Sequence, residues 1–413
     1  MTSAIATVES HVPVLDVLHR DFVANPIPMI DRMLREQPIA FDPRLGGWLI
    51  GRYSDTMALQ RDPRLHSNRV GYITAALSPD LRAQIMPLSD WYEQWLPMKD
   101  APEHTRLRRL AAPAFQPRNL TRLEARVEAI VHEILDQVMA AGEMEVVHDF
   151  AFPLPRAIIG AMIGIPDADI HQLMPWTRDL IALLGGEVNT AEAIARARRS
   201  HDELVAYYRE LIEERRREPV EGEILSSLVV AHEAGDRLSM DELITMIALL
   251  TVGGYETTAQ LIANGTLLLL ENPDQLALLR AQPALIPNAV EEMLRLQPSP
   301  SFNTRTVRES FEYQGHGFEA GQILYFMTVA TNRDPERFAE PHRFDITRPN
   351  SNEHLTFGFG IHHCLGAALG RMEARIAFQH LVARLPGMYL PEQPIARHPS
   401  MAMRALERLV IRW

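Results

Sequence analysis

The chain has 413 residues, with 41 basic and 53 acidic side chains and a formal net charge of −12. Apolar residues make up 46% of it and charged residues 23%, an ordinary globular composition that excludes a disordered or fibrous chain. The acidic balance argues against a nucleic-acid binder, because affinity for nucleic acid depends on a basic surface. The single cysteine, Cys364, excludes an intramolecular disulfide and a multi-cysteine zinc site.

The elements predicted along the chain are mainly helical. Residues 1–30 contain charged side chains and no long apolar run, so we expect no signal peptide, no membrane anchor and a cytoplasmic protein. Apolar runs at 39–41 and 48–50 flank a turn-rich segment and predict a β-hairpin. Apolar residues then recur at helical spacing from Leu120, and a second strand-rich patch lies at 311–327. One large, mainly helical domain with small sheets, spanning residues 1–413, is the simplest architecture.

A long helix is predicted in the second half of the chain. Ser239 and Glu242 form a capping box that opens it, and the helix can continue to Glu271, where Asn272 and a proline stop it. This span of about 32 residues is roughly 48 Å long at the helical rise. Residues 243–255 carry no charge, which predicts a buried central helix. An acidic residue in its middle and the lack of flanking anchors argue against a membrane span.

Residues 357–366 surround the cysteine with glycines that allow positive φ and a close approach of the backbone to a ligand. A thiolate at Cys364 would be stabilised by backbone N–H groups and by the start of the helix that is predicted to follow. Such a cradle suits a cysteine bound to iron. A buried structural cysteine is the ordinary alternative. However, the chance of Phe, Gly, His and Gly at offsets −7, −4, −2 and +2 is roughly four in a million for this composition.

A second constellation lies inside the long helix, where Gly253 and Gly254 precede Glu256 and Thr257. Adjacent glycines in a helix interior are unfavourable by about 1 kcal/mol each relative to alanine. Because glycine has no side chain, these positions leave space beside the helix for another group. An acid and a hydroxyl follow within one turn. Close packing against a neighbouring helix is the alternative interpretation.

Two further pairs share helix faces. Glu292 and Arg295 lie three residues apart, so an ion pair is possible, although the same spacing recurs elsewhere in the chain as ordinary solvated pairs. His104 and Arg108 lie four residues apart, and a solvated basic face is the ordinary interpretation of such a pair.

Taken together, these motifs resemble those of the cytochrome P-450 superfamily of haem-thiolate monooxygenases. The pattern Phe-x-x-Gly-x-His-x-Cys-x-Gly in residues 357–366 is similar to the family's haem-binding loop. The resemblance covers nearly the whole chain. It implies the cytochrome P-450 fold, mainly α with small β-sheets, with haem b between the long central helix and the cysteine loop.

The resemblance also implies a role for particular residues. It makes Cys364 the iron ligand, and it makes Glu256 and Thr257 an acid–alcohol pair that delivers protons. The other haem-binding residues that it implies are His104, Arg108, Arg305, Phe357, Gly358, His362 and Gly366. A structural triad behind the haem would consist of Glu292, Arg295 and Arg343. The substrate pocket would include Leu249, Gly253, Ser301, Phe302 and Met401.

The implied reaction inserts one oxygen atom from dioxygen into a small, mainly apolar substrate of terpenoid, steroid, fatty acid or polyketide type. Electrons must come from outside, because no flavin or iron–sulfur motif is present. We expect a ferredoxin and its NAD(P)H-dependent reductase as partners of a monomer that binds neither nucleic acid nor membrane. The arginines expected to receive the ferredoxin are Arg106, Arg109, Arg371 and Arg375.

Three other functions remain open from the sequence. One is a peroxide-driven or non-oxygenating haem-thiolate enzyme. Another is a cysteine hydrolase that uses Cys364 with a histidine, although no motif for cleaving amides or esters is present. The third is a haem-storing or partner-recruiting module.

Overall fold

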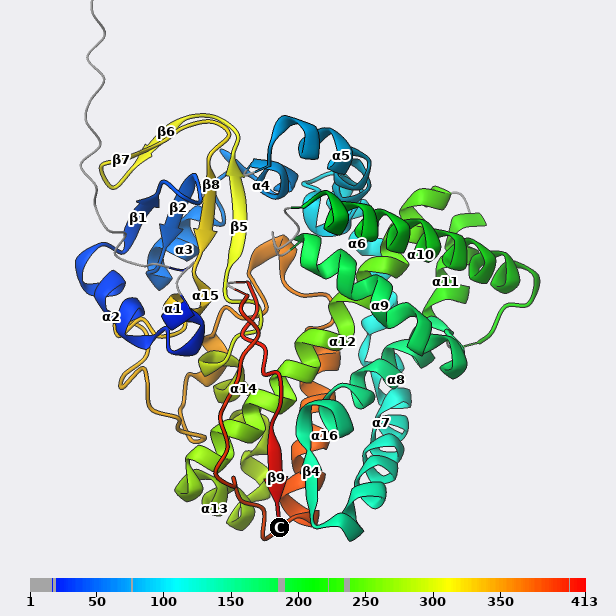
Figure 1. Ribbon diagram of the computed structural model, residues 1–413, viewed down its shortest axis with the longest axis vertical. Helices are drawn as coiled ribbons and strands as arrows, with labels where there is room; N and C mark the ends of the chain where they lie inside the picture. The colour runs from blue at the N-terminus through cyan, green and yellow to red at the C-terminus, as the bar shows by residue number, and fades with distance from the viewer. Residues whose placement is uncertain are drawn as a thin grey trace, which may run out of the picture.

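A large helical part and a smaller strand-rich part lie side by side in the computed structural model (Figure 1). The structure describes residue 17 and residues 20–75, 77–184, 190–221, 223–233, 238–400 and 402–413. The helices are α1 (Arg20–Ala24), α2 (Ile27–Glu36), α3 (Tyr53–Leu59), α4 (Val70–Ala75), α5 (Pro79–Glu93), α6 (Glu103–Ala111), α7 (Pro117–Val138), α8 (Pro153–Ile163), α9 (Asp167–Leu184), α10 (Ala191–Arg217), α11 (Ile224–Glu233), α12 (Met240–Glu271), α13 (Pro273–Ala281), α14 (Ile286–Leu296), α15 (Thr328–Thr331) and α16 (Ala367–Arg384).

The strands form one larger sheet and two small ones within the described residues. They are β1 (Ile39–Asp42), β2 (Gly47–Ile50), β3 (Leu65–His66), β4 (Glu143–Glu145), β5 (Asn303–Val307), β6 (Phe311–Tyr313), β7 (His316–Phe318), β8 (Ile323–Phe326) and β9 (Val410–Arg412). The larger sheet has the order β1-β2-β8-β5-β3, and only the β2–β8 pair is parallel. The pairs β4–β9 and β6–β7 form the small sheets. The mainly helical fold with small sheets is therefore confirmed.

The predicted hairpin forms between β1 and β2, with Ile39 opposite Ile50 and Asp42 opposite Gly47. The fully buried Asp42 carboxylate accepts a hydrogen bond from the backbone N–H of Arg44 at 2.9 Å, which stabilises the turn. Gly46 completes the turn at a φ of +61°, a conformation that side chains with a β-carbon rarely adopt.

The long central helix is also confirmed as α12, which crosses the middle of the helical part (Figure 1). Both hydrogen bonds of the capping box form, from Glu242 N to Ser239 Oγ and from Ser239 N to Glu242 Oε2. The helix ends where Pro273 begins α13. Most of its residues are buried, because α8, α14 and α16 pack around it.

The largest hydrophobic cluster occupies the helical part, and two smaller clusters lie on the faces of the larger sheet. By length and composition, the segment Val146–Ile163 could cross a membrane, but 61% of it is buried inside the protein. Burial of this kind is typical of a core element rather than of a lipid-facing span.

A buried carboxyl group on α16 is unusual for its lack of partners. Glu373 has no exposed surface, and neither of its oxygens has a hydrogen-bond partner in the described part of the chain. Burial raises its pKa from 4.5 to about 8. The side chain is therefore held as a neutral acid at neutral pH.

This raised pKa predicts a pH-dependent stability. The folded-state pKa of Glu373 lies above its unfolded value. Its contribution to the free energy of unfolding is therefore fully present below pH 4.5 and is lost as the pH rises through about 8. Between these pH values the wild type should lose on the order of a few kcal/mol in the free energy of unfolding. Glu373→Gln has no titrating group at this position, so we expect it not to show this loss. Urea unfolding of the haem-loaded protein at several pH values measures the effect, with the exposed Glu407→Gln as the control. An unchanged pH profile in Glu373→Gln would contradict the prediction.

Candidate functional site

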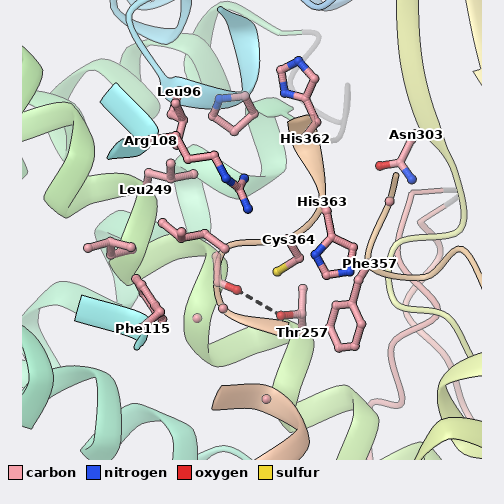
Figure 2. A pocket seen from close by; sticks show the side chains of 18 of the residues that line it. Leu96, Arg108, Phe115, Leu249, Thr257, Asn303, Phe357, His362, His363 and Cys364 are labelled. Carbon is pink, nitrogen blue, oxygen red and sulfur yellow. Dashed lines mark hydrogen bonds between the residues drawn. The ribbon is translucent and has the colours of Figure 1, made fainter. Parts of the chain in front are cut away.

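The cysteine lies in a loop that folds back on itself before α16. Gly358 and Gly360 adopt φ values of +70° and +68°, so both positions favour glycine. The backbone N–H of Cys364 donates to the carbonyl oxygen of Phe357 at 2.7 Å, which closes the loop. The loop thereby presents the cysteine side chain to a large cavity (Figure 2).

The Cys364 thiol is exposed only because the cavity opens over it, since the side chain otherwise lies deep in the protein. Burial raises the pKa of the thiol, whereas the Gly366 backbone N–H and the Arg108 and Arg371 guanidinium groups act in the opposite direction. These donors and cations would stabilise a thiolate.

The cavity holds about 1130 Å³ of space when its open mouth is included. One wall is apolar and contains Leu96, Leu249 and Leu250, and the bare helix face at Gly253 continues it. A β-carbon at Gly253 would meet no atom within 4 Å, so a flat group can lie directly against the helix there. A β-carbon at Gly254 would instead collide with Ile159 of α8. The adjacent glycines thus serve different purposes, one opening the cavity and the other allowing helix packing.

One end of the cavity is strongly basic. Arg69, His104, Arg108, Arg305 and His362 all line it. The rings of His104 and His362 lie 4.3 Å apart, and the buried Nδ1 of His104 has no hydrogen-bond partner among the described residues. Burial, followed by the Arg305 guanidinium, lowers the pKa of His362 to about 3. Burial likewise lowers the pKa of Arg305 to about 10.

Neighbouring side chains position this basic end. The Oγ of Ser67 lies 2.7 Å from Nε2 of His362, and the Ser67 backbone N–H donates to Asp100. Asp100 is the acidic residue whose charge reaches His104 and Arg305. The cluster therefore offers hydrogen bonds and positive charge to carboxylate groups entering the cavity. Arg69 and Ser67 were not among the predicted haem-binding residues, because no motif marks them.

On α12, only one member of the predicted acid–alcohol pair lies at the cavity. Thr257 lines it, and its hydroxyl donates to the Gly253 carbonyl oxygen at 3.0 Å (Figure 2). Glu256 is half-buried and is not part of the cavity wall. Burial and then the Glu256 charge raise the pKa of Tyr255 to about 12. The relay role of Glu256 stays a prediction.

The predicted substrate residues separate into three groups. Leu249 and Gly253 line the cavity, and Met401 lies outside the described residues. Ser301 and Phe302 are not part of the wall of either this cavity or the one that adjoins it, so their contact with a substrate stays a prediction.

Local contacts explain why both residues lie away from the wall. The backbone N–H of Ser301 donates to the Ala402 carbonyl oxygen at 2.8 Å, and the side chain is buried in this contact. The Phe302 ring packs edge-on against Tyr325 with 5.4 Å between centroids, in a cluster on the sheet. Gln297, Ser299 and Asn303 of the same segment line the adjoining cavity instead, and no sequence signal separates them from their neighbours.

The predicted structural triad is wrong in one member. Glu292 and Arg295 form a fully buried, bidentate ion pair at 2.7 and 2.8 Å. The third member is Arg348, whose Nε donates to Glu292 Oε1 at 3.0 Å. The Arg343 side chain is 55% exposed and pairs with Glu340. Only the backbone carbonyl of Arg343 reaches the network, because its side chain points to the surface while the carbonyl accepts from both buried arginines.

Comparisons with known proteins agree on one family. The family model described as Cytochrome P450 matches residues 188–403. "Cytochrome P450 CYP107DY1" of Priestia megaterium is 38% identical, with 88% of this chain and 89% of the relative covered. "Polyketide biosynthesis cytochrome P450 PksS" of Bacillus subtilis is 34% identical, with coverages of 95% and 96%. The solved structure of P450BioI in complex with hexadec-9Z-enoic acid ligated acyl carrier protein has a TM-score of 0.88 at 35% identity, with coverages of 95% and 99%.

The contrast between Arg348 and Arg343 gives a direct test of the buried network. Arg348→Met leaves the Glu292 charge buried with one partner fewer, so we expect a loss of about 3–5 kcal/mol in the free energy of unfolding. Arg343→Met removes an exposed pair and should change stability by less than about 1 kcal/mol. Urea unfolding at one fixed haem concentration measures both variants. Equal losses of unfolding free energy in the two variants would contradict the assignment of Arg348 as the third member of the triad.

Proposed function

Because this chain belongs to the cytochrome P450 family and is a haem-dependent monooxygenase, we propose that it oxidises a small, mainly apolar organic substrate in the cavity over Cys364. The reaction inserts one oxygen atom from dioxygen by hydroxylation or epoxidation. The observation that carries the proposal is that one cavity combines a lone thiol, a bare helix face and a basic end. The protein acts as a cytoplasmic monomer.

The residues present fit haem b. Cys364 Sγ would ligate the iron, while Phe357, Gly358 and Gly366 would surround the ligand from the cysteine side. The flat ring would lie against the helix face left open by Gly253.

The basic end of the cavity suits the two propionate groups of haem. His104, Arg108, Arg305 and His362 would hold them, with Arg69 beside these residues. The orphaned Nδ1 of His104 supports this, because an unpaired buried polar atom is unfavourable until it gains a partner. Two carboxylates would also balance the buried Arg305 guanidinium, for which Asp100 is the acidic neighbour among the described residues.

The bound haem supplies the binding and reductive activation of dioxygen, favoured by thiolate donation. The chain supplies positioning and protons. The Thr257 hydroxyl, which lines the cavity, would release its bond to the Gly253 carbonyl and donate a proton into the cavity. Glu256 would return a proton to Thr257 from the outer side of α12. The apolar wall at Leu249 and Leu250 would exclude water from the reacting centre.

We propose that a ferredoxin, reduced by an NAD(P)H-dependent reductase, delivers the electrons on the cysteine side. Three of the arginines expected to receive it are paired within the chain. Their partners are Glu242 for Arg106, Glu291 for Arg371 and Glu124 for Arg375. The docking partner would therefore compete with the chain's own carboxylates. This exchange is easier at the part-exposed Arg375–Glu124 pair than at Arg371, whose mostly buried partner Glu291 accepts at 2.7 and 2.9 Å.

The first test concerns thiolate ligation. The reduced, haem-loaded protein exposed to carbon monoxide should show the red-shifted Soret band of a thiolate-bound haem. Cys364→Ser should lose this band, whereas the neighbouring variant His363→Gln should keep it. A wild-type protein without the shifted band would refute the proposal.

The second test concerns the Thr257 hydroxyl and the source of oxygen. With ferredoxin, reductase and NADPH, Thr257→Ala should form roughly tenfold less product per NADPH oxidised and release the difference as hydrogen peroxide. Thr257→Ser retains the hydroxyl and should restore most of the coupling. Unchanged coupling in Thr257→Ala would remove Thr257 from proton delivery. Equal product formation with peroxide alone would instead favour a peroxide-driven enzyme.

A further inference from the structure

The segment between α14 and β5 forms a polar wall of the cavity. Gln297, Ser299 and Asn303 line a second cavity of about 790 Å³ including its opening, which adjoins the first because Thr257, Asn303 and Cys364 line both. Polar groups that face such a space are unfavourable unless they gain a hydrogen-bond partner.

The Gln297 amide has a fixed orientation. The Nε of the buried Arg404 donates to Gln297 Oε1 at 3.2 Å, so the oxygen of the amide faces Arg404. The Nε2 group is then the part of the amide left to donate into the cavity. Arg404 has no carboxylate partner in the described part of the chain, and burial lowers its pKa to about 9. This desolvated cation adds a positive potential behind the amide.

The neighbouring polar groups also have unused hydrogen-bonding capacity. Within the described residues, the Ser299 hydroxyl makes only a weak contact of 3.9 Å to the sulfur of Met403. The Asn303 amide makes no hydrogen bond to any residue that the structure describes. Asn303 lies across the cavity from Leu249 (Figure 2), so the polar and apolar walls face each other.

We propose that the substrate is amphipathic, with an apolar body against Leu249 and Leu250 and a carbonyl oxygen that accepts a hydrogen bond from Gln297 Nε2. The chemical class is a ketone, ester, lactone or amide rather than a bare hydrocarbon. This inference depends on the proposed function, because it assigns the substrate of the same cavity. Gln297 is then a specificity-determining residue, and Arg404 is the residue that positions it.

The physical reason is the penalty for leaving the wall unpaired. A hydrocarbon would displace water from Gln297 and offer nothing in return, whereas a carbonyl oxygen replaces the lost hydrogen bond. Sites that hydrogen-bond a polar group reject analogues that lack it, because their own buried groups are then left without partners.

The experiment compares two probes of the same ring size, cyclododecanone and cyclododecane, which differ by one carbonyl group. Spectral titration of the ferric, haem-loaded protein gives a dissociation constant for each probe. We expect the wild type to bind the ketone at least tenfold more tightly than the hydrocarbon.

Two variants at Gln297 distinguish a hydrogen bond to the ketone from a simple fit to its shape. Gln297→Leu removes the amide, and Gln297→Glu keeps its size and the acceptor for Arg404 but replaces the donor with an oxygen. Both should lower the preference for the ketone at least fivefold, mainly by weakening ketone binding. Gln282→Glu, at an exposed position beyond α13, adds the same charge elsewhere and should leave the preference unchanged.

Several results would overturn the inference. A wild type that binds the hydrocarbon as tightly as the ketone would do so, and so would an unchanged preference in both Gln297 variants. The carbon monoxide spectrum of each protein separates this failure from failure of the proposed function. A retained red-shifted band with no ketone preference refutes only the substrate class, whereas a missing band in the wild type refutes the enzyme assignment itself.

Discussion

One buried carboxylate, Glu292, fixes the segment that leads to the cysteine loop. It holds the Arg295 guanidinium, which in turn donates to the Asn332 carbonyl oxygen at 2.9 Å. The Asn332 side chain then accepts from Leu355 N at 2.8 Å and donates to the Thr356 hydroxyl at 2.9 Å. These residues directly precede the loop, so the position of the thiol depends on a chain of buried hydrogen bonds. A buried charge is tolerable here because the Glu292 carboxylate accepts hydrogen bonds from Arg295, from Arg348 and from the backbone N–H of Asp345.

The basic end of the cavity differs from the Glu292 network, because its charged groups are of one sign. Arg108, Arg305 and the two neighbouring histidines are gathered at an end of the cavity where none of the described lining residues is a carboxylate. Burial lowers the pKa of both His362 and Arg305, and repulsion from Arg305 and the other nearby cations lowers the pKa of His362 further, so this arrangement is unfavourable for the protein alone. The proposed binding of the haem propionates by these residues would offset the unfavourable energy. Stability and cofactor binding would then be linked in the same side chains.

The remaining walls of the cavity contribute different chemical groups. α12 contributes an open face at Gly253 and a hydroxyl at Thr257, both produced by local helix geometry. The segment after α14 contributes amide and hydroxyl groups, and Gln297 is oriented from behind by Arg404. An apolar wall beside oriented donors discriminates among substrates by the penalty for unpaired polar groups rather than by contact area.

Local patterns were sufficient for much of this molecule. The sequence alone determined the capping box of α12, the Glu292–Arg295 pair and the glycine-rich cysteine loop, because partners within a few residues are fixed by helix and turn geometry. Only the tertiary structure decided which distant arginine joins Glu292 and which residues after α14 face the cavity. Those choices depend on how separate segments pack, and residues of the same type that lie near one another along the chain can point into the core or into solvent.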